Sequence, residues 1–175
     1  MTVAAFVLGV VATVLAAASL TWQLAAVLLR GAQPKLTPVV GLLTPEGLVA
    51  NDAASNVSDS LARAAEQFQP GRFVLGVKVV NTGREPFHVD EWAIRADTDG
   101  TSLIPGEAPD GGTRVPHDIA PGASAIFITD LQRAHRFADV TEGLSGLPIV
   151  LTVSSGTRTY VTKPVAPELF SLGRA

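Results

Sequence analysis

Residues 72–96 read RFVLGVKVVNTGREPFHVDEWAIRA, and this stretch decides the fold class. Its first nine residues alternate between two faces and are rich in β-branched side chains, which is typical of a β-strand. Asn81, Gly83 and Pro86 form a turn cluster, because Asn and Gly tolerate positive φ and Pro closes a loop. A second extended run follows, so the stretch predicts the two arms of a β-hairpin.

The apolar alternation slips by one residue at Asp90-Glu91, within the second arm. A β-bulge inserts one extra residue into a strand, so a bulge at this point restores a single apolar face. The bulge predicts that four side chains of this arm face the core: Phe87, Val89, Trp92 and Ile94.

His88, Asp90 and Glu91 raise the question of a metal or acid–base site. We interpret them as surface residues of a strand, because a metal site needs three or four converging ligands and a supporting second shell. Neighbouring carboxylates on a strand splay apart, which argues against Asp90 and Glu91 as a glycosidase pair. The remaining alternative is that the fold brings His117-Asp118 and His135 close to His88.

Other sequence signals of chemistry are missing. The chain has no G-x-S-x-G, P-loop, G-x-G-x-x-G or H-E-x-x-H motif, and no cysteine for disulfides, thiolate ligands or nucleophiles. The net charge of -3, with arginines scattered singly, argues against a nucleic-acid partner. We expect no enzyme activity and no catalytic, cofactor-binding or metal-binding residue. Four loop carboxylates could suggest calcium, but they lack EF-hand spacing: Asp97, Asp99, Glu107 and Asp110.

Residues 3–29 carry no charged side chain. A helix of this length is about 40 Å long at ~1.5 Å per residue, enough to span a bilayer core of roughly 30 Å. A signal peptide would have a positive n-region and a shorter apolar stretch, whereas no Lys or Arg precedes residue 30. We predict a single transmembrane anchor in residues 1–30, with the lipid bilayer as its partner. A cleaved signal and a buried core helix are the alternatives.

Two basic residues give the orientation of this anchor. Arg30 and Lys35 follow the apolar stretch, and only the terminal amine precedes it. The positive-inside rule therefore predicts that the C-terminal domain is cytoplasmic, with an extracytoplasmic domain as the alternative.

The rest of the chain divides into three parts. Residues 31–71 predict a connecting strand or hairpin that turns at Pro45-Glu46-Gly47, then a short helix that ends at Pro70-Gly71. Residues 72–165 predict the main β domain, and residues 166–175 a flexible tail.

Turn signals organise the main β domain. Asp99-Gly100 predicts a tight turn, strands flank Pro121-Gly122, and the last hairpin turns at Gly156. Asp130 can N-cap a short helix over residues 131–140. About seven strands and two short helices predict a mainly β fold, an antiparallel two-sheet sandwich of the immunoglobulin-like kind.

A family resemblance agrees with this fold. The pattern resembles bacterial immunoglobulin-like modules, and the whole layout looks like uncharacterised actinobacterial and phage-type single-pass membrane proteins with one such domain. The resemblance covers residues 3–35 and 72–165 and implies a fold but no activity. The residues that carry it are Val77, Val79, Asn81-Thr82-Gly83, Pro86, Trp92, Ile119, Pro121-Gly122, Ser124 and Asp130-Leu131 with Ala134.

The functional hypothesis is a membrane-anchored, non-enzymatic interaction module with a protein partner. Three loops could contact that partner, at residues 97–102, 105–116 and 154–158. One alternative is a structural subunit of a larger membrane or phage assembly, in which residues 16–23 pack on neighbouring helices. A less favoured alternative is an enzyme whose site forms only in three dimensions.

Overall fold

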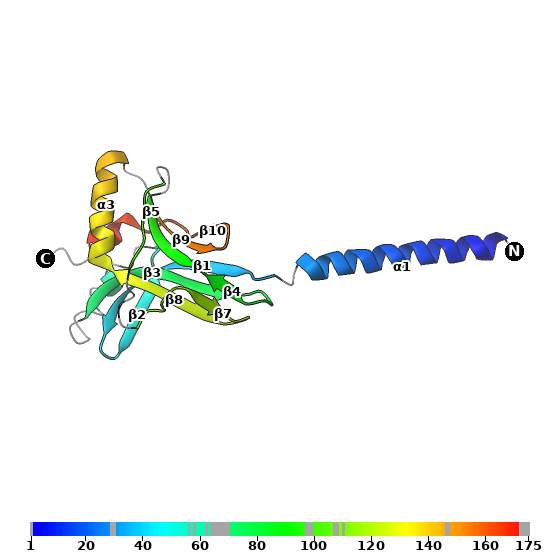
Figure 1. Cartoon of the computed structure of the whole chain (residues 1–175), viewed down its shortest axis with the longest axis horizontal. Helices are drawn as coiled ribbons and strands as arrows, with labels where there is room; N and C mark the ends of the chain where they lie inside the picture. The colour runs from blue at the N-terminus through cyan, green and yellow to red at the C-terminus, as the bar shows by residue number, and fades with distance from the viewer. Residues whose placement is uncertain are drawn as a thin grey trace.

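The chain folds into antiparallel sheets that follow one N-terminal apolar helix (Figure 1). This confirms the predicted mainly β class. The computed structural model describes residues 2–28, 31–55, 57, 59–61, 63, 71–96, 100–106, 109, 111–145 and 148–171.

The described ranges contain ten strands, where about seven were predicted, together with two α-helices of defined bounds and one 3-10 helix. In chain order they are α1 (Thr2–Leu28), β1 (Pro34–Thr44), β2 (Gly47–Asp52), β3 (Arg72–Asn81), β4 (Phe87–Val89), β5 (Glu91–Ala96), β6 (Ser102–Leu103), β7 (His117–Ile119), β8 (Ser124–Asp130), α3 (Leu131–Ser145), β9 (Ile149–Ser155), β10 (Arg158–Val161) and η1 (Pro167–Ser171).

The strands form two four-stranded sheets and a two-stranded ribbon. The first sheet has the order β2-β1-β3-β8, the second β10-β9-β5-β6, and β4 pairs with β7 in the ribbon. One hydrophobic core takes buried side chains from all three, including Val77 of β3, Phe87 of β4 and Leu151 of β9. Burial of this shared core holds the sheets together.

Two prolines are accommodated in β1, which is an interior strand. Gln33 accepts a hydrogen bond from Thr82 on the β3 side, and Pro38 accepts one from Ala53 on the β2 side. Because backbone groups alternate along a strand, the nitrogens of Pro34 and Pro38 point away from β3. The missing donors therefore interrupt no bond between β1 and β3. The predicted hairpin over residues 31–50 is confirmed as β1 and β2.

The stretch over residues 72–96 forms strands as predicted, but not a hairpin. β3 pairs with β1 and β8, whereas β4 pairs with β7 and β5 pairs with β9 and β6. The turn cluster after Asn81 therefore carries the chain from one sheet to another. The strands that flank Pro121-Gly122 make a similar crossing, since β7 joins the ribbon and β8 joins the first sheet.

The phase slip predicted at Asp90 is present, as a break between two strands that pair in different sheets. The extended run breaks at Asp90, between β4 and β5, and the backbone N–H of Asp90 donates to the Ser154 carbonyl at 3.0 Å. His88, Asp90 and Glu91 are exposed. All four apolar side chains expected on the core face are buried: Phe87, Val89, Trp92 and Ile94.

The C-terminal third contains one correct and one wrong prediction. The Asp130 carboxylate accepts the Gln132 N–H at 2.8 Å, which confirms the N-cap of α3, although α3 extends to Ser145. The prediction of a loose tail from Ala166 is wrong for residues 166–171. Residues 167–171 form η1, and Leu169 and Phe170 are buried in the core, where η1 contacts α3.

The segment predicted as a short helix before Pro70-Gly71 lies largely outside the described residues. Its described part, residues 59–61 and 63, is helical, and Leu61 is fully buried in the core.

Helix α1 extends away from the β domain (Figure 1). Its stretch Phe6–Gln23 is long and apolar enough to cross a membrane, and none of it is buried against the rest of the protein. It is the one such helix in the described residues. In the structure, this helix therefore does not form part of the core of the chain.

The fully buried amide of Asn81 ties the segment after α1 to the domain. Its Oδ1 accepts the N–H groups of Gln33 at 3.3 Å and Gly83 at 3.0 Å. Its Nδ2 donates to the carbonyls of Glu85 at 2.7 Å and Ile119 at 3.0 Å. All hydrogen-bonding positions of one side chain are thus used to join three segments of the chain.

We predict that Asn81→Ala lowers the free energy of unfolding by about 2–4 kcal/mol, because it leaves several buried backbone groups without partners. Asn81→Asp should be as harmful, since it sets carboxylate oxygens against the carbonyls of Glu85 and Ile119. Chemical unfolding of the full chain in detergent measures both. Arg84→Ala, at an exposed position in the same loop, should change stability by less than about 0.5 kcal/mol. Equal effects of the three variants would contradict this role.

Gly76 is a second point on which the first sheet depends. A Cβ atom at Gly76 would overlap the backbone carbonyl oxygen of Phe127 on β8. We predict that Gly76→Ala costs about 1–3 kcal/mol or more, since backbone must move to relieve the overlap. Gly106→Ala is the control, because a Cβ there meets nothing within 4 Å. Thermal unfolding that ranks the two variants equally would refute the prediction.

Candidate functional site

The β4–β7 ribbon brings His88 and Asp118 together. The two residues are directly opposite in the ribbon, and His88 Nδ1 lies 2.5 Å from Asp118 Oδ1. On the other side of the ring, His88 Nε2 lies 3.3 Å from Asp90 Oδ1. One imidazole therefore bridges two carboxylates. The side chains are 49% exposed at His88, 45% at Asp90 and 71% at Asp118, so solvent reaches all three.

Asp90 also has a structural contact. Its Oδ2 accepts the N–H of Gly156 at 2.5 Å, in the turn between β9 and β10 where Gly156 has a φ of +57°. The left-handed conformation of Gly156 presents its N–H toward Asp90. Asp90 thus anchors a turn of the second sheet, which gives it a role independent of any ligand.

The other residues considered at this site lie elsewhere. The His117 ring packs edge-on against Phe127, with ring centroids 6.3 Å apart. His135 lies on α3, where its Nδ1 is 2.9 Å from Asp139. In the described part of the chain, no group of three or more His, Asp or Glu side chains is placed to hold a metal ion. The four loop carboxylates considered for calcium lie outside the described residues.

The carboxylates raise the pKa of His88 above its ordinary value of 6.5. The main cause is the hydrogen bond to Asp118; partial desolvation opposes it, and the charges of both carboxylates add to it. A raised pKa means that the protonated ring is favoured in the folded protein. The resulting stabilisation is complete below the unfolded value and is lost as the pH rises through the folded value.

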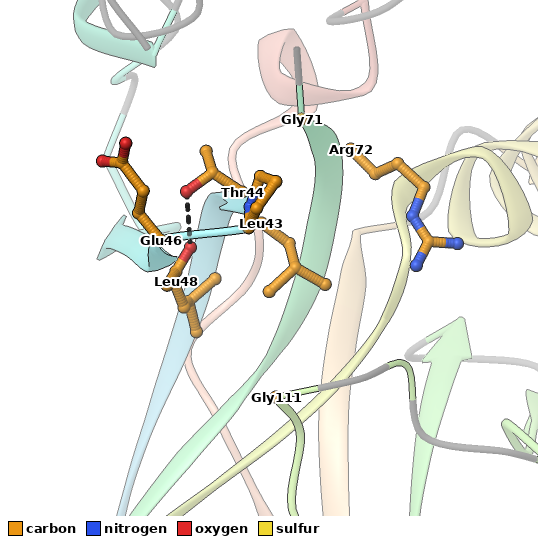
Figure 2. Close-up of a pocket in the computed structure, with 9 residues that line it drawn as sticks. Leu43, Thr44, Glu46, Leu48, Gly71, Arg72 and Gly111 are labelled. Atoms are coloured by element: carbon orange, nitrogen blue, oxygen red, sulfur yellow. Dashed lines mark hydrogen bonds between the residues drawn. The ribbon is translucent and has the colours of Figure 1, made fainter. Parts of the chain in front are cut away.

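A cleft of about 600 Å³ opens at the turn between β1 and β2 (Figure 2). β1 begins beside the end of α1 and runs to this turn, so the cleft lies at the end of the first sheet away from α1. In Figure 2, Glu46 and Arg72 lie on opposite sides of it. The lining residues are Leu43, Thr44, Pro45, Glu46, Gly47, Leu48, Gly71, Arg72 and Gly111.

Glycines leave this cleft open. Gly47, Gly71 and Gly111 contribute no side chains, and Thr44 Oγ1 donates to the Gly47 carbonyl at 3.1 Å, which holds the turn. Gly111 comes from the 105–116 loop, one of the three loops predicted to contact a partner. The turn at Pro45-Glu46 was predicted, but the approach of Gly71 and Gly111 to it has no local sequence signal.

We predict that the pKa of His88, followed by NMR titration of the imidazole carbons, lies above 6.5 and falls toward 6.5 in Asp118→Asn. Loss of the charged hydrogen-bond acceptor is the physical reason. Asp139→Asn, which alters the neighbour of His135, is the control and should leave the His88 titration unchanged. An unchanged titration in Asp118→Asn would show that the contact is not formed in solution.

No protein-family model, no curated protein and no solved structure matches the chain. The function is therefore inferred from the chain's own residues and their geometry.

Proposed function

We propose that this protein is a single-pass membrane protein whose β domain is a non-enzymatic module that binds another protein. The observation that carries the proposal is the wholly exposed apolar stretch Phe6–Gln23, which precedes a folded domain whose first segment, at Gln33, is held by the buried amide of Asn81. An exposed apolar helix of this length is costly in water and stable in a bilayer.

The polar groups of α1 favour a helix that crosses the membrane alone over a helix that packs against others in an assembly. Thr13 and Thr21 donate their hydroxyls to the carbonyls of Gly9 and Ala17, at 2.9 Å and 2.8 Å. Gln23 Nε2 lies 3.4 Å from the Ser19 hydroxyl, also within the helix. These groups find partners without a neighbouring helix, so packing against one is not needed to satisfy them.

The connections between sheets support an immunoglobulin-like sandwich as the fold of the module. Successive strands pass between sheets after β3 and after β7, and one core joins the sheets. Such crossings are a property of two-sheet antiparallel folds. The domain lies in the cytoplasm in this proposal, because Lys35 and Arg30 follow the anchor.

The polar features of the domain favour binding over catalysis. The ring of His88 is held by two carboxylates, and one of these anchors the turn at Gly156. The cleft between Glu46 and Arg72 offers a concave surface with both apolar and charged residues, as sites of recognition do.

The test uses a chain whose single thiol is introduced by Thr157→Cys, since the natural chain has no cysteine and Thr157 is exposed. In native membranes, a crosslinker that reacts with this thiol through a maleimide group should join the chain to another protein and give a discrete adduct. Adding Val14→Arg should reduce both the membrane fraction after alkaline extraction and the adduct, because Arg at a helix centre costs about 2.5–3.5 kcal/mol.

Val140→Arg is the matched control. Val140 is also an exposed apolar residue of a helix, but it lies in α3 and not in the proposed membrane anchor. It should retain both the membrane fraction and the adduct. A chain that stays in the membrane after Val14→Arg would contradict the anchor. Adducts that contain only further copies of this chain would instead indicate the structural subunit of an assembly.

A further inference from the structure

The two edge strands of the first sheet differ in how their outer sides are used. β8 is one edge, and the Ile126 carbonyl on its outer side accepts the Thr113 N–H at 2.8 Å. Gly112 lies so close that a Cβ there would meet the Ile128 side chain at 2.7 Å. The loop that contains Gly112 and Thr113 therefore covers this edge, which is a common protection against strand addition.

β2 is the other edge of the sheet, and no strand or loop among the described residues pairs with its outer side. Ala53 donates to Pro38 of β1, and Thr44 pairs with Gly47, so the backbone groups of Gly47, Val49 and Asn51 point toward β1. Those of Leu48 and Ala50 must point outward. Within the described residues no backbone or side-chain group pairs with them, and Ala50 is exposed.

The sequence of β2 lacks the two residues that most often protect an edge strand. Its six residues, GLVAND, contain no proline and no lysine, the two residues that most often block strand addition. The strand also leads directly into the cleft, because Gly47 and Leu48 belong to both. An added strand would therefore lie beside a cavity able to receive one of its side chains.

The charges of the edge specify its occupant. Glu46 precedes β2 and Asp52 ends it, and both are exposed. Asp52 uses one oxygen to accept the Ala54 N–H at 2.8 Å, and its second oxygen carries charge to the surface. Acidic groups at both ends of β2 are complementary to an extended segment that carries basic residues, whereas Arg72 in the cleft disfavours a basic side chain there.

We propose that β2 binds an extended, basic segment of a partner protein by strand addition, with one side chain of that segment in the cleft formed by Leu43, Leu48 and Gly111. The site rests on the proposed function and names the surface through which the module binds. The outward N–H and C=O groups of Leu48 and Ala50 supply the main-chain hydrogen bonds.

A second copy of the chain is a poorer occupant. Antiparallel pairing of two β2 strands would place Glu46 of one copy at the Asp52 end of the other. Like charges directly across a strand pair are destabilising. The partner is therefore a different chain, and self-association is an outcome that the experiment detects.

Proline at position 50 gives a direct test. Ala50→Pro removes the outward N–H and leaves the bonds between β1 and β2 intact. The probe is a short fluorescent peptide that alternates lysine and valine, titrated by anisotropy against the full chain in detergent micelles. We expect Ala50→Pro to weaken its binding by about tenfold or more. A peptide with glutamate in place of lysine should bind at least about tenfold more weakly to the unaltered chain.

Thr159→Pro is the matched control. Thr162 donates to Leu151, so Thr159 points its N–H to the outer edge of β10, and the same change there should leave peptide binding unaltered. Glu46→Lys is a second variant that keeps the backbone of β2, and it should weaken binding of the lysine peptide. Unfolding curves confirm that each variant is folded.

Three outcomes would overturn the site: equal loss of binding in the two proline variants, equal binding of the lysine and glutamate peptides, or a dimer that Ala50→Pro abolishes. If the Thr157→Cys adduct in native membranes survives Ala50→Pro, the partner binds elsewhere, and the site fails while the proposed function stands. If the Thr157→Cys chain with its native Ala50 gives no adduct but the lysine peptide still binds the β2 edge, the proposed function fails instead.

Discussion

The amide of Asn81 is the interaction on which the arrangement of this chain depends. It joins the segment after α1 to the loop after β3 and to the end of β7, and it does so from a fully buried position. Thr82 adds two hydrogen bonds to the Gln33 carbonyl, each 2.9 Å long. Because these bonds set where β1 begins beside β3, they also set the register of the first sheet. A side chain that lacked either the donor or the acceptor would leave buried groups unpaired.

Local features of the sequence were enough to predict much of the fold. The alternation in β3, the phase slip at Asp90 and the N-cap at Asp130 each involve residues close in sequence. The interactions that produce them are therefore between residues close in the chain, and the structure has all three features. The long apolar stretch of α1 is a local signal of the same kind, because its length and composition decide it.

Features that depend on pairing between distant segments were not predictable in this way. Asn81 was recognised only as a turn residue, yet its amide bonds to Ile119 across 38 positions of sequence. The contact of His88 with Asp118 depends on the register of β4 with β7, and no single-sequence pattern fixes that register. The loop after Asn81 has the composition of a hairpin turn but connects two sheets. Turn chemistry sets the local backbone and leaves open which strands become neighbours.

The two ends of the first sheet differ in what a partner would have to displace. At the end beside α1, backbone groups of Gln33, Asn81 and Gly122 already form hydrogen bonds within the chain. Gly122 donates to the Asn81 carbonyl, and Gln33 donates to the Asn81 side chain. A strand that bound there would break native hydrogen bonds with a net worth of about 1 kcal/mol each. At the far end, the outward groups of Leu48 and Ala50 would gain partners while no hydrogen bond among the described residues is lost. In the proposed membrane protein, a domain closed beside α1 and unpaired at the outer side of β2 therefore favours contacts made away from the point of attachment.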